Sequence, residues 1–179
     1  MPNALSKTIA LIIAVMLLFI FPIKSEFERQ DEISRMFVLT ETTKLVDSVR
    51  NLGYITPVMY QEYANKLAMT NNIYEIKLEH YRMRYDPVYD DPTVAATFKN
   101  SFNVNYDANF TEDILEKLFT DSPEADRIYR MSKGDYFLVK VCNKNKTMAT
   151  RIQEMLYNAD FAPERIMVSY GGMIKDEGY

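Results

Sequence analysis

The residues best suited to chemistry in this sequence are its one histidine and its one cysteine, His80 and Cys142. Nucleophilic catalysis needs a base positioned beside the nucleophile, and a zinc site needs about three or four protein ligands. No second histidine or cysteine is present to complete either kind of site. We therefore interpret His80 as a structural or half-exposed histidine, and Cys142 as a small buried residue at the end of an apolar strand.

Carboxylates are densest at Asp86, Asp90 and Asp91, two of which are followed by proline. Paired carboxylates act as general acid and base when an apolar pocket raises the pKa of one of them. A loop bounded by prolines does not supply such a pocket. We interpret this cluster as a solvated turn.

Four polar residues with side-chain oxygens recur at every second position, namely Asn103, Asn105, Asp107 and Asn109. This spacing suits a calcium loop, but only one of the four is a carboxylate, and Ala108 stands where the sharp turn of such a loop needs Gly. The competing interpretation is an edge strand with the alternate residues inward, and we favour it. The residues expected to point inward are Phe102, Val104 and Tyr106.

A short basic and aromatic stretch comprises Tyr81, Arg82, Arg84 and Tyr85. It would suit an anionic polymer, but the net charge of −4 argues against nucleic acid as a partner. The sequence has no Gly-rich phosphate loop, no Gly-x-Ser-x-Gly and no His-Glu-x-x-His. We therefore expect no enzyme activity, no cofactor and no metal.

The elements that hold these residues begin with an uncharged run, Thr8 to Ile23, between Lys7 and Lys24. This run is apolar all round, which is typical of a segment that lies in lipid. A cleaved signal should end in small residues, whereas this run ends in bulky ones. We predict a retained transmembrane helix at residues 8–23, with a cleaved signal as the alternative.

Basic residues on the two sides of the run do not decide its orientation. A seven-residue tail before a first apolar helix is typical of an anchor that sends its C-terminal part across the membrane. We therefore predict a cytoplasmic tail at residues 1–7 and an extracytoplasmic remainder. The expected location is the cell membrane, with a single pass.

A stem helix is predicted at residues 24–52, because residues 26–52 contain neither Gly nor Pro. Its near half is charged, and its far half carries an apolar stripe that we expect to pack on a domain. The stripe consists of Val38, Leu45, Val49 and Leu52. Gly53 is suited to the left-handed cap that ends the helix.

Residues 53–179 predict a small α+β domain with a mostly antiparallel sheet of three to five strands. Thr56 and Pro57 begin a helix whose apolar face includes Tyr63 and Leu67. A strand is expected from Tyr74 to about Tyr85, and Asp86 then opens an irregular stretch. Further elements are expected as a helix near 112–119 capped by Thr111, a strand at 136–142, a helix near 147–158 and a strand at 166–170. The predicted stripe of the 147–158 helix is Met148, Ile152, Met155 and Leu156.

An apolar helix that continues into an amphipathic helix, followed by a small sheet domain, resembles the type IV pilin-like family. The short tail and the α+β remainder resemble the minor pseudopilins of Tad-type pili. The resemblance lies in the layout of residues 1–52 and the order of the later elements. Pilins of this family carry a Glu just inside the apolar run, whereas the run of this chain has no acidic residue. The resemblance implies an assembly or tip component.

Two functions from different classes follow. The first is a membrane-anchored structural subunit of a pilus, secretion or conjugation apparatus. Its partners would be the bilayer, through Thr8 to Ile23, and other pilin-like or envelope subunits. The second is a single-pass protein whose outer domain binds or senses a ligand, which a pocket with convergent polar groups would favour.

Overall fold

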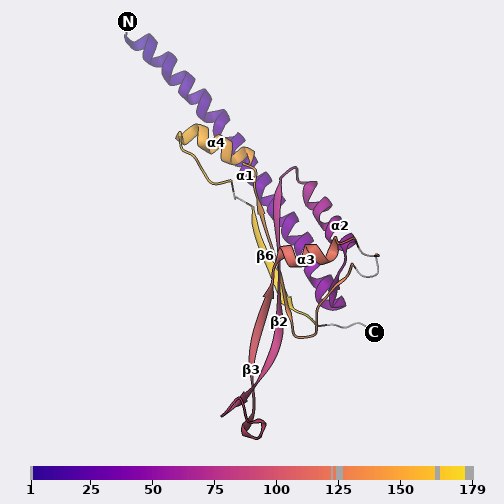
Figure 1. Ribbon diagram of the computed structural model, residues 1–179. Helices are drawn as coiled ribbons and strands as arrows, with labels where there is room; N and C mark the ends of the chain where they lie inside the picture. Colours follow the sequence, from indigo (N-terminus) through magenta and orange to yellow (C-terminus); the bar gives the residue numbers. More distant parts are fainter. Residues whose placement is uncertain (1, 122, 124–126, 164–165, 176–179) are drawn as a thin grey trace.

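The chain folds into one long N-terminal helix and a small α+β domain that packs on the C-terminal half of that helix (Figure 1). The computed structural model describes residues 2–121, 123, 127–163 and 166–175. The main sheet has four antiparallel strands. The predicted fold class and sheet are therefore confirmed.

Helix α1, Pro2–Leu52, contains both the apolar run and the predicted stem without a break. Pro22 lies inside it, and a proline there removes one backbone hydrogen bond of the helix. The helix ends where Gly53 adopts a left-handed φ of 73° and its N–H donates to Val49 O at 2.8 Å. Gly53 is the predicted cap, because a residue without Cβ takes this conformation at little cost.

The remaining elements form the domain that follows α1. In chain order they are β1 (Tyr54–Ile55), α2 (Pro57–Ala68), β2 (Tyr74–Tyr89), the 3₁₀ turn η1 (Ala95–Thr97), β3 (Phe98–Asn109), α3 (Thr111–Leu118), β4 (Tyr129–Arg130), β5 (Tyr136–Asn143), α4 (Met148–Tyr157) and β6 (Met167–Met173). The sheet order is β3-β2-β5-β6, and β1 pairs with β4 in a second sheet of two strands.

Helix starts are set by local side chains, as the sequence indicates. Thr56 caps α2 by accepting from Met59 N at 3.3 Å, and Thr147 caps α4 in the same way from Thr150 N. The prediction for α3 was wrong in one detail, since Thr111 is its first residue and not its cap. The Thr111 hydroxyl instead accepts from Leu78 N at 2.9 Å, which ties α3 to β2.

The core lies between α1, α2 and the sheet. A hydrogen bond of 2.7 Å between Thr42 Oγ1 and Tyr63 Oη also joins α1 to α2. Three of the four predicted stripe residues of α1 are buried in this core, and Leu52 is not. Leu52 is 42% exposed because it is the last residue of the helix, where the chain turns at Gly53. The core members from α1 and the sheet are Val38, Leu45, Val46, Val49, Leu78, Phe137, Val139, Val141 and Val168.

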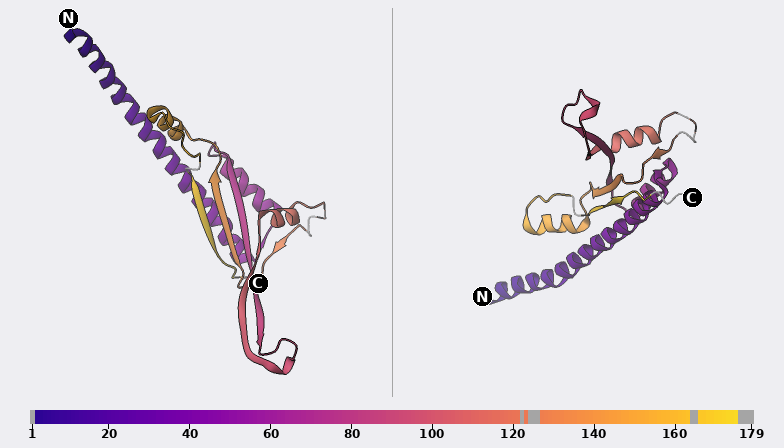
Figure 2. Two further views of the ribbon diagram at one scale, coloured as in Figure 1. Left: turned by 60° about the vertical axis from the view of Figure 1, so that its left-hand side comes forward. Right: turned by 90° about the horizontal axis from the view of Figure 1, so that it is seen from below.

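Strand β2 continues four residues beyond its predicted end and forms, with β3, a hairpin that projects beyond the domain (Figures 1 and 2). The expectation of irregular chain from Asp86 was wrong. Strand β5 pairs with β2 only up to Tyr81, so one edge of β2 is open beyond that point. Pro87, which has no N–H, is tolerated in a strand with an open edge.

Two apolar faces that the sequence predicts are largely exposed to solvent. Phe102, Val104 and Tyr106 of β3 are 56%, 48% and 51% exposed rather than inward, because the hairpin has no layer beneath it. On α4, Met148 and Met155 are exposed, and the buried residues are Ala149 and Thr150. Of the predicted stripe, Met148, Met155 and Leu156 are therefore exposed, and only Ile152 is half-buried.

Candidate functional site

The only histidine lies at the centre of a buried hydrogen-bond network on β2. His80 Nδ1 is 2.8 Å from Tyr129 Oη, and His80 Nε2 is 2.9 Å from Asp135 Oδ2. Both side chains of the His80–Asp135 pair are buried, at 0% and 2% exposure. Of the two alternatives for His80, the structural one therefore agrees with its burial, and the half-exposed one does not.

Asp135 also fixes the backbone on both sides of this pair. Its carboxylate accepts from Met83 N at 2.9 Å and from Ser132 N at 2.8 Å. The preceding Gly134 has φ of +96°, and a Cβ there would come within 2.5 Å of Met83 Cε. The turn is therefore held close against β2, and Asp135 joins the two elements.

A histidine oriented by a carboxylate is the acid–base half of a catalytic triad. Here, however, both ring nitrogens of His80 are occupied within the protein, one by Tyr129 and the other by Asp135. Burial of the imidazole lowers the pKa of His80, against the opposing effect of Asp135. In this geometry the pair connects the turn to the sheet, which agrees with the structural interpretation of His80.

Cys142 is far from this pair. On the β2–β5 ladder it faces Glu75, whereas His80 faces Phe137, so five residues of strand separate them, or about 17 Å. The Cys142 thiol is half-buried and lies 3.5 Å from Glu75 Oε2. Cys142 is thus less buried than predicted, and the structure does not bring Cys142 and His80 together.

The acidic cluster predicted in a turn is divided among three separate contacts. Asp86 lies in β2, and its carboxylate accepts from Arg84 and from Asn105 Nδ2 at 2.6 Å. Asp90 forms an ion pair with Lys99, and Asp91 accepts from Thr93 N at 2.9 Å. Among the described residues, no group of three or more His, Cys, Asp or Glu side chains could hold a metal ion.

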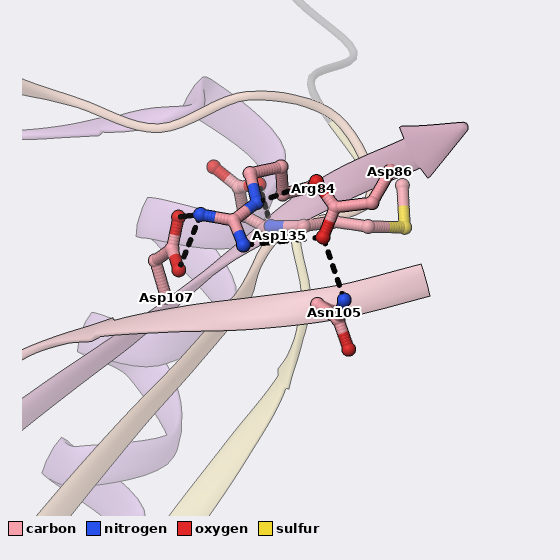
Figure 3. Close-up of polar contacts among 6 residues, drawn as sticks. Arg84, Asp86, Asn105, Asp107 and Asp135 are labelled. Carbon is pink, nitrogen blue, oxygen red and sulfur yellow. Dashed lines mark hydrogen bonds and ion pairs between the residues drawn. The ribbon is translucent and has the colours of Figure 1, made fainter. Parts of the chain in front are cut away.

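Arg84 is the centre of the polar face of the hairpin, between Asp86 and Asp107 (Figure 3). The Arg84 guanidinium lowers the pKa of Asp86, and Asn105 lowers it further. Asn105 and Asp107 thus bind side chains of β2 across a regular ladder. The edge-strand interpretation of this segment is confirmed, in place of the calcium loop.

The opposite face of the hairpin is apolar, and we call it the hairpin apolar face. Its cross-strand pairs are Met83 with Tyr106, Tyr85 with Val104 and Pro87 with Phe102. Tyr85 is 57% exposed, in addition to the three exposed β3 residues already described. Exposed apolar patches of this kind mark surfaces that bind another molecule. The sequence analysis missed this face, although the alternation of polar and apolar residues from Arg82 to Pro87 was a signal for it.

The largest exposed apolar surface is the N-terminal part of α1. The helix is long and apolar enough to cross a membrane, and none of its most apolar segment is buried by the rest of the protein. Beyond the apolar run, Ile33 and Met36 remain 57% and 61% exposed. Large side chains in this arrangement are stable only against lipid or another protein.

A polar cavity of about 310 Å³ lies where α1, the turn after α2 and the start of α4 meet. Several of its polar groups bind each other, since Thr147 donates to Asp31 at 2.7 Å and Asn145 donates to Asn72 at 3.0 Å. The complete lining is Gln30, Asp31, Ser34, Thr70, Asn71, Asn72, Asn145, Lys146, Thr147, Met148 and Arg151.

Comparison with known proteins adds no family to this description. The sequence matches no protein-family model, no curated protein and no solved structure. The function is therefore inferred from the apolar helix, the hairpin apolar face and the polar cavity.

Proposed function

We propose that this protein is a membrane-anchored structural subunit, similar to a minor pilin or pseudopilin, of a pilus, secretion or conjugation apparatus. The apolar part of α1 lies in the bilayer, and the α+β domain lies outside the cytoplasm. One observation carries this proposal. The N-terminal part of α1 is apolar and is not covered by the rest of the protein, whereas the C-terminal part of the same helix belongs to the core of the domain.

The exposed surfaces support assembly with other subunits. In α1, Ile33 and Met36 are exposed outside the apolar run, where a neighbouring helix can cover them. The hairpin apolar face lies at the opposite end of the molecule from the N-terminus (Figure 1). A subunit with apolar contacts at both ends is suited to a chain of successive partners.

The domain is proposed to have no enzyme activity. The support is the geometry of its best candidate, since both nitrogens of His80 are bound within a buried network and Cys142 lies elsewhere on the sheet. The functional surfaces are then those that bind other molecules.

The topology is tested by protease treatment of intact spheroplasts that carry the full chain. We expect digestion of residues 53–179 together with protection of the apolar segment. A domain that stays intact until the membrane is dissolved would reverse the proposed orientation. A mature N-terminus beyond Ile23 would show that the apolar run is a cleaved signal.

The assembly is tested by photo-crosslinking from position Met36 in cells, with Met69 as the control. Met36 and Met69 are both strongly exposed, at 61% and 79%, but only Met36 lies on α1. We expect specific adducts with other envelope subunits, or with copies of this chain, from Met36 alone. A Met36 probe that labels only lipid or solvent would remove the support for assembly through α1.

A second function, ligand binding by the outer domain, is favoured by the polar cavity between α1 and α4. The variant Ser34→Tyr fills this cavity, because Ser34 is half-buried in its lining. Complementation by Ser34→Tyr supports the structural subunit. Loss of function with normal folding and normal Met36 crosslinking would support a ligand in the cavity.

A further inference from the structure

Helix α4 lies beside the part of α1 where the apolar run ends. Thr147 donates to Asp31, and Gln153 Nε2 donates to Glu28 Oε1 at 3.0 Å. Glu28 is five residues beyond Ile23, which is about 7.5 Å along a helix. The headgroup region of a bilayer adds roughly 5 to 8 Å on each side of the hydrocarbon core. Gln153 is therefore at headgroup level when residues 8–23 span the core.

The C-terminal end of α4 extends further toward the apolar run. The start of α4 lies at Asp31 and its middle at Glu28, so the helix runs toward the N-terminus of α1, as Figures 1 and 2 both show. Ile20 and Lys24 are half-buried, although residues 4–19 are all exposed. This burial follows the side of α1 that continues to Glu28 and Asp31, at helical spacings of three and four residues.

This end of α4 and the loop after it carry four exposed apolar residues, which we call the α4 apolar surface. They are Met155, Leu156, Tyr157 and Phe161, at 70%, 40%, 62% and 39% exposure. The rings of Tyr157 and Phe161 pack edge to face, with centroids 6.4 Å apart. Tyrosine is enriched where a membrane meets water, because its ring is apolar and its hydroxyl is polar.

The charges near this surface are compatible with a lipid headgroup layer. Lys146 Nζ binds Glu154 Oε1 at 2.6 Å and also pairs with Asp160. These two carboxylates are thereby neutralised in part. The buried residues of α4 are Ala149 and Thr150, whereas Met155, Leu156 and Tyr157 are exposed at its C-terminal end.

We propose that the α4 apolar surface is a second membrane contact, which inserts into the headgroup layer on the same side as the domain. This inference rests on the proposed anchoring of α1 in the bilayer. With two contacts on the bilayer, the domain is held at a fixed tilt instead of turning freely about α1. The occupant of the surface is lipid because α4 lies beside α1 at Glu28 and Asp31 and runs from there toward the apolar run.

The experiment places an environment-sensitive fluorophore at single cysteines of the full chain, reconstituted in phosphatidylcholine vesicles. Cys142→Ser supplies the background, and the labelled positions are Met155→Cys, Tyr157→Cys, Val104→Cys and Ile13→Cys. All four are exposed, so a label there is tolerated, and a circular dichroism spectrum equal to that of the unlabelled chain verifies folding. Nitroxide lipids quench the label, with the nitroxide placed either near the headgroup or deep in the acyl chain.

We expect the nitroxide near the headgroup to quench most of the fluorescence of the labels at 155 and 157. We expect no quenching of the label at 104 on the hairpin. Ile13 reports on the anchor, and we expect loss there with the deep nitroxide. Quenching at 13 without quenching at 155 and 157 overturns the α4 contact and leaves the anchor intact. No quenching at 13 overturns the anchor and with it this inference. A third outcome is that nitroxide lipids do not quench the label at 155, but its emission shifts to the blue at a higher protein-to-lipid ratio. This outcome would assign the surface to a second copy of the chain, and it also overturns the proposal.

Discussion

His80 and Asp135 form a buried pair, 2.9 Å apart, that joins β2 to the turn before β5. The carboxylate also holds the N–H groups of Met83 and Ser132. We expect Asp135→Ala to lower the free energy of unfolding by about 3 to 5 kcal/mol, because it leaves buried donors without an acceptor. Urea unfolding of the full chain in detergent measures this. A change below about 1 kcal/mol would mean that water replaces the carboxylate.

The pH dependence of stability follows from the lowered pKa of His80. The unfolded chain binds a proton at His80 near the ordinary value of 6.5, whereas burial keeps the folded imidazole neutral to lower pH. The His80 contribution is therefore fully present above pH 6.5 and is lost as pH falls below it, at up to about 1.4 kcal/mol per pH unit. Urea midpoints between pH 7.5 and 5.5 measure this slope. The control is His80→Gln, in which we expect the slope of this window to flatten.

Leu45 and Leu52 provide a matched pair on the same helix. Leu45 is 7% exposed and Leu52 is 42% exposed. We expect Leu45→Ala to destabilise the domain by about 2 to 5 kcal/mol, since it opens a cavity in the core. Leu52→Ala should cost much less. Equal melting temperatures for Leu45→Ala and the unchanged chain would show that this part of α1 packs on a partner instead of on the domain.

The two faces of the hairpin should differ in their effect on function. Val104→Asp lies on the hairpin apolar face, whereas Asn103→Asp lies on the polar face one residue away. Val104 is exposed, so we expect Val104→Asp to change the free energy of unfolding by no more than about 0.5 kcal/mol. Asn103→Asp places a second carboxylate opposite Asp86, which costs up to about 1 kcal/mol, so the control is the more destabilised of the two variants. Complementation in the native cell should fail for Val104→Asp and succeed for Asn103→Asp. Normal function of Val104→Asp would exclude the hairpin apolar face as a required contact.

Local signals predicted the elements well, because helix caps and alternation depend on neighbouring residues. Thr56 and Gly53 each have the role that the sequence indicates. The direction in which an apolar face points could not be predicted in the same way. Met155 and Tyr106 have suitable periodicity for a core face, but each lies on an element with no layer packed against that side.

The candidate site was harder to predict, because its partners are distant in the sequence. His80 binds Tyr129 and Asp135, which are 49 and 55 residues away along the chain. No spacing rule connects such residues before the fold is known. The end of β2 was missed because Pro87 was interpreted as a strand breaker, although the open edge beyond Tyr81 removes the need for its N–H.

The continuity of α1 also makes the molecule a lever. A helix of 51 residues is about 76 Å long, and beyond Pro22 it has neither glycine nor proline at which to bend. Force applied at the membrane end therefore reaches the domain through the contact between α1 and β6. Arg50 closes that contact, since its Nε donates to Met173 O at 3.0 Å and its backbone carbonyl accepts from Lys175 N at 2.9 Å. The load that the protein withstands is set by this junction at the edge strand, and not by the helix that delivers it.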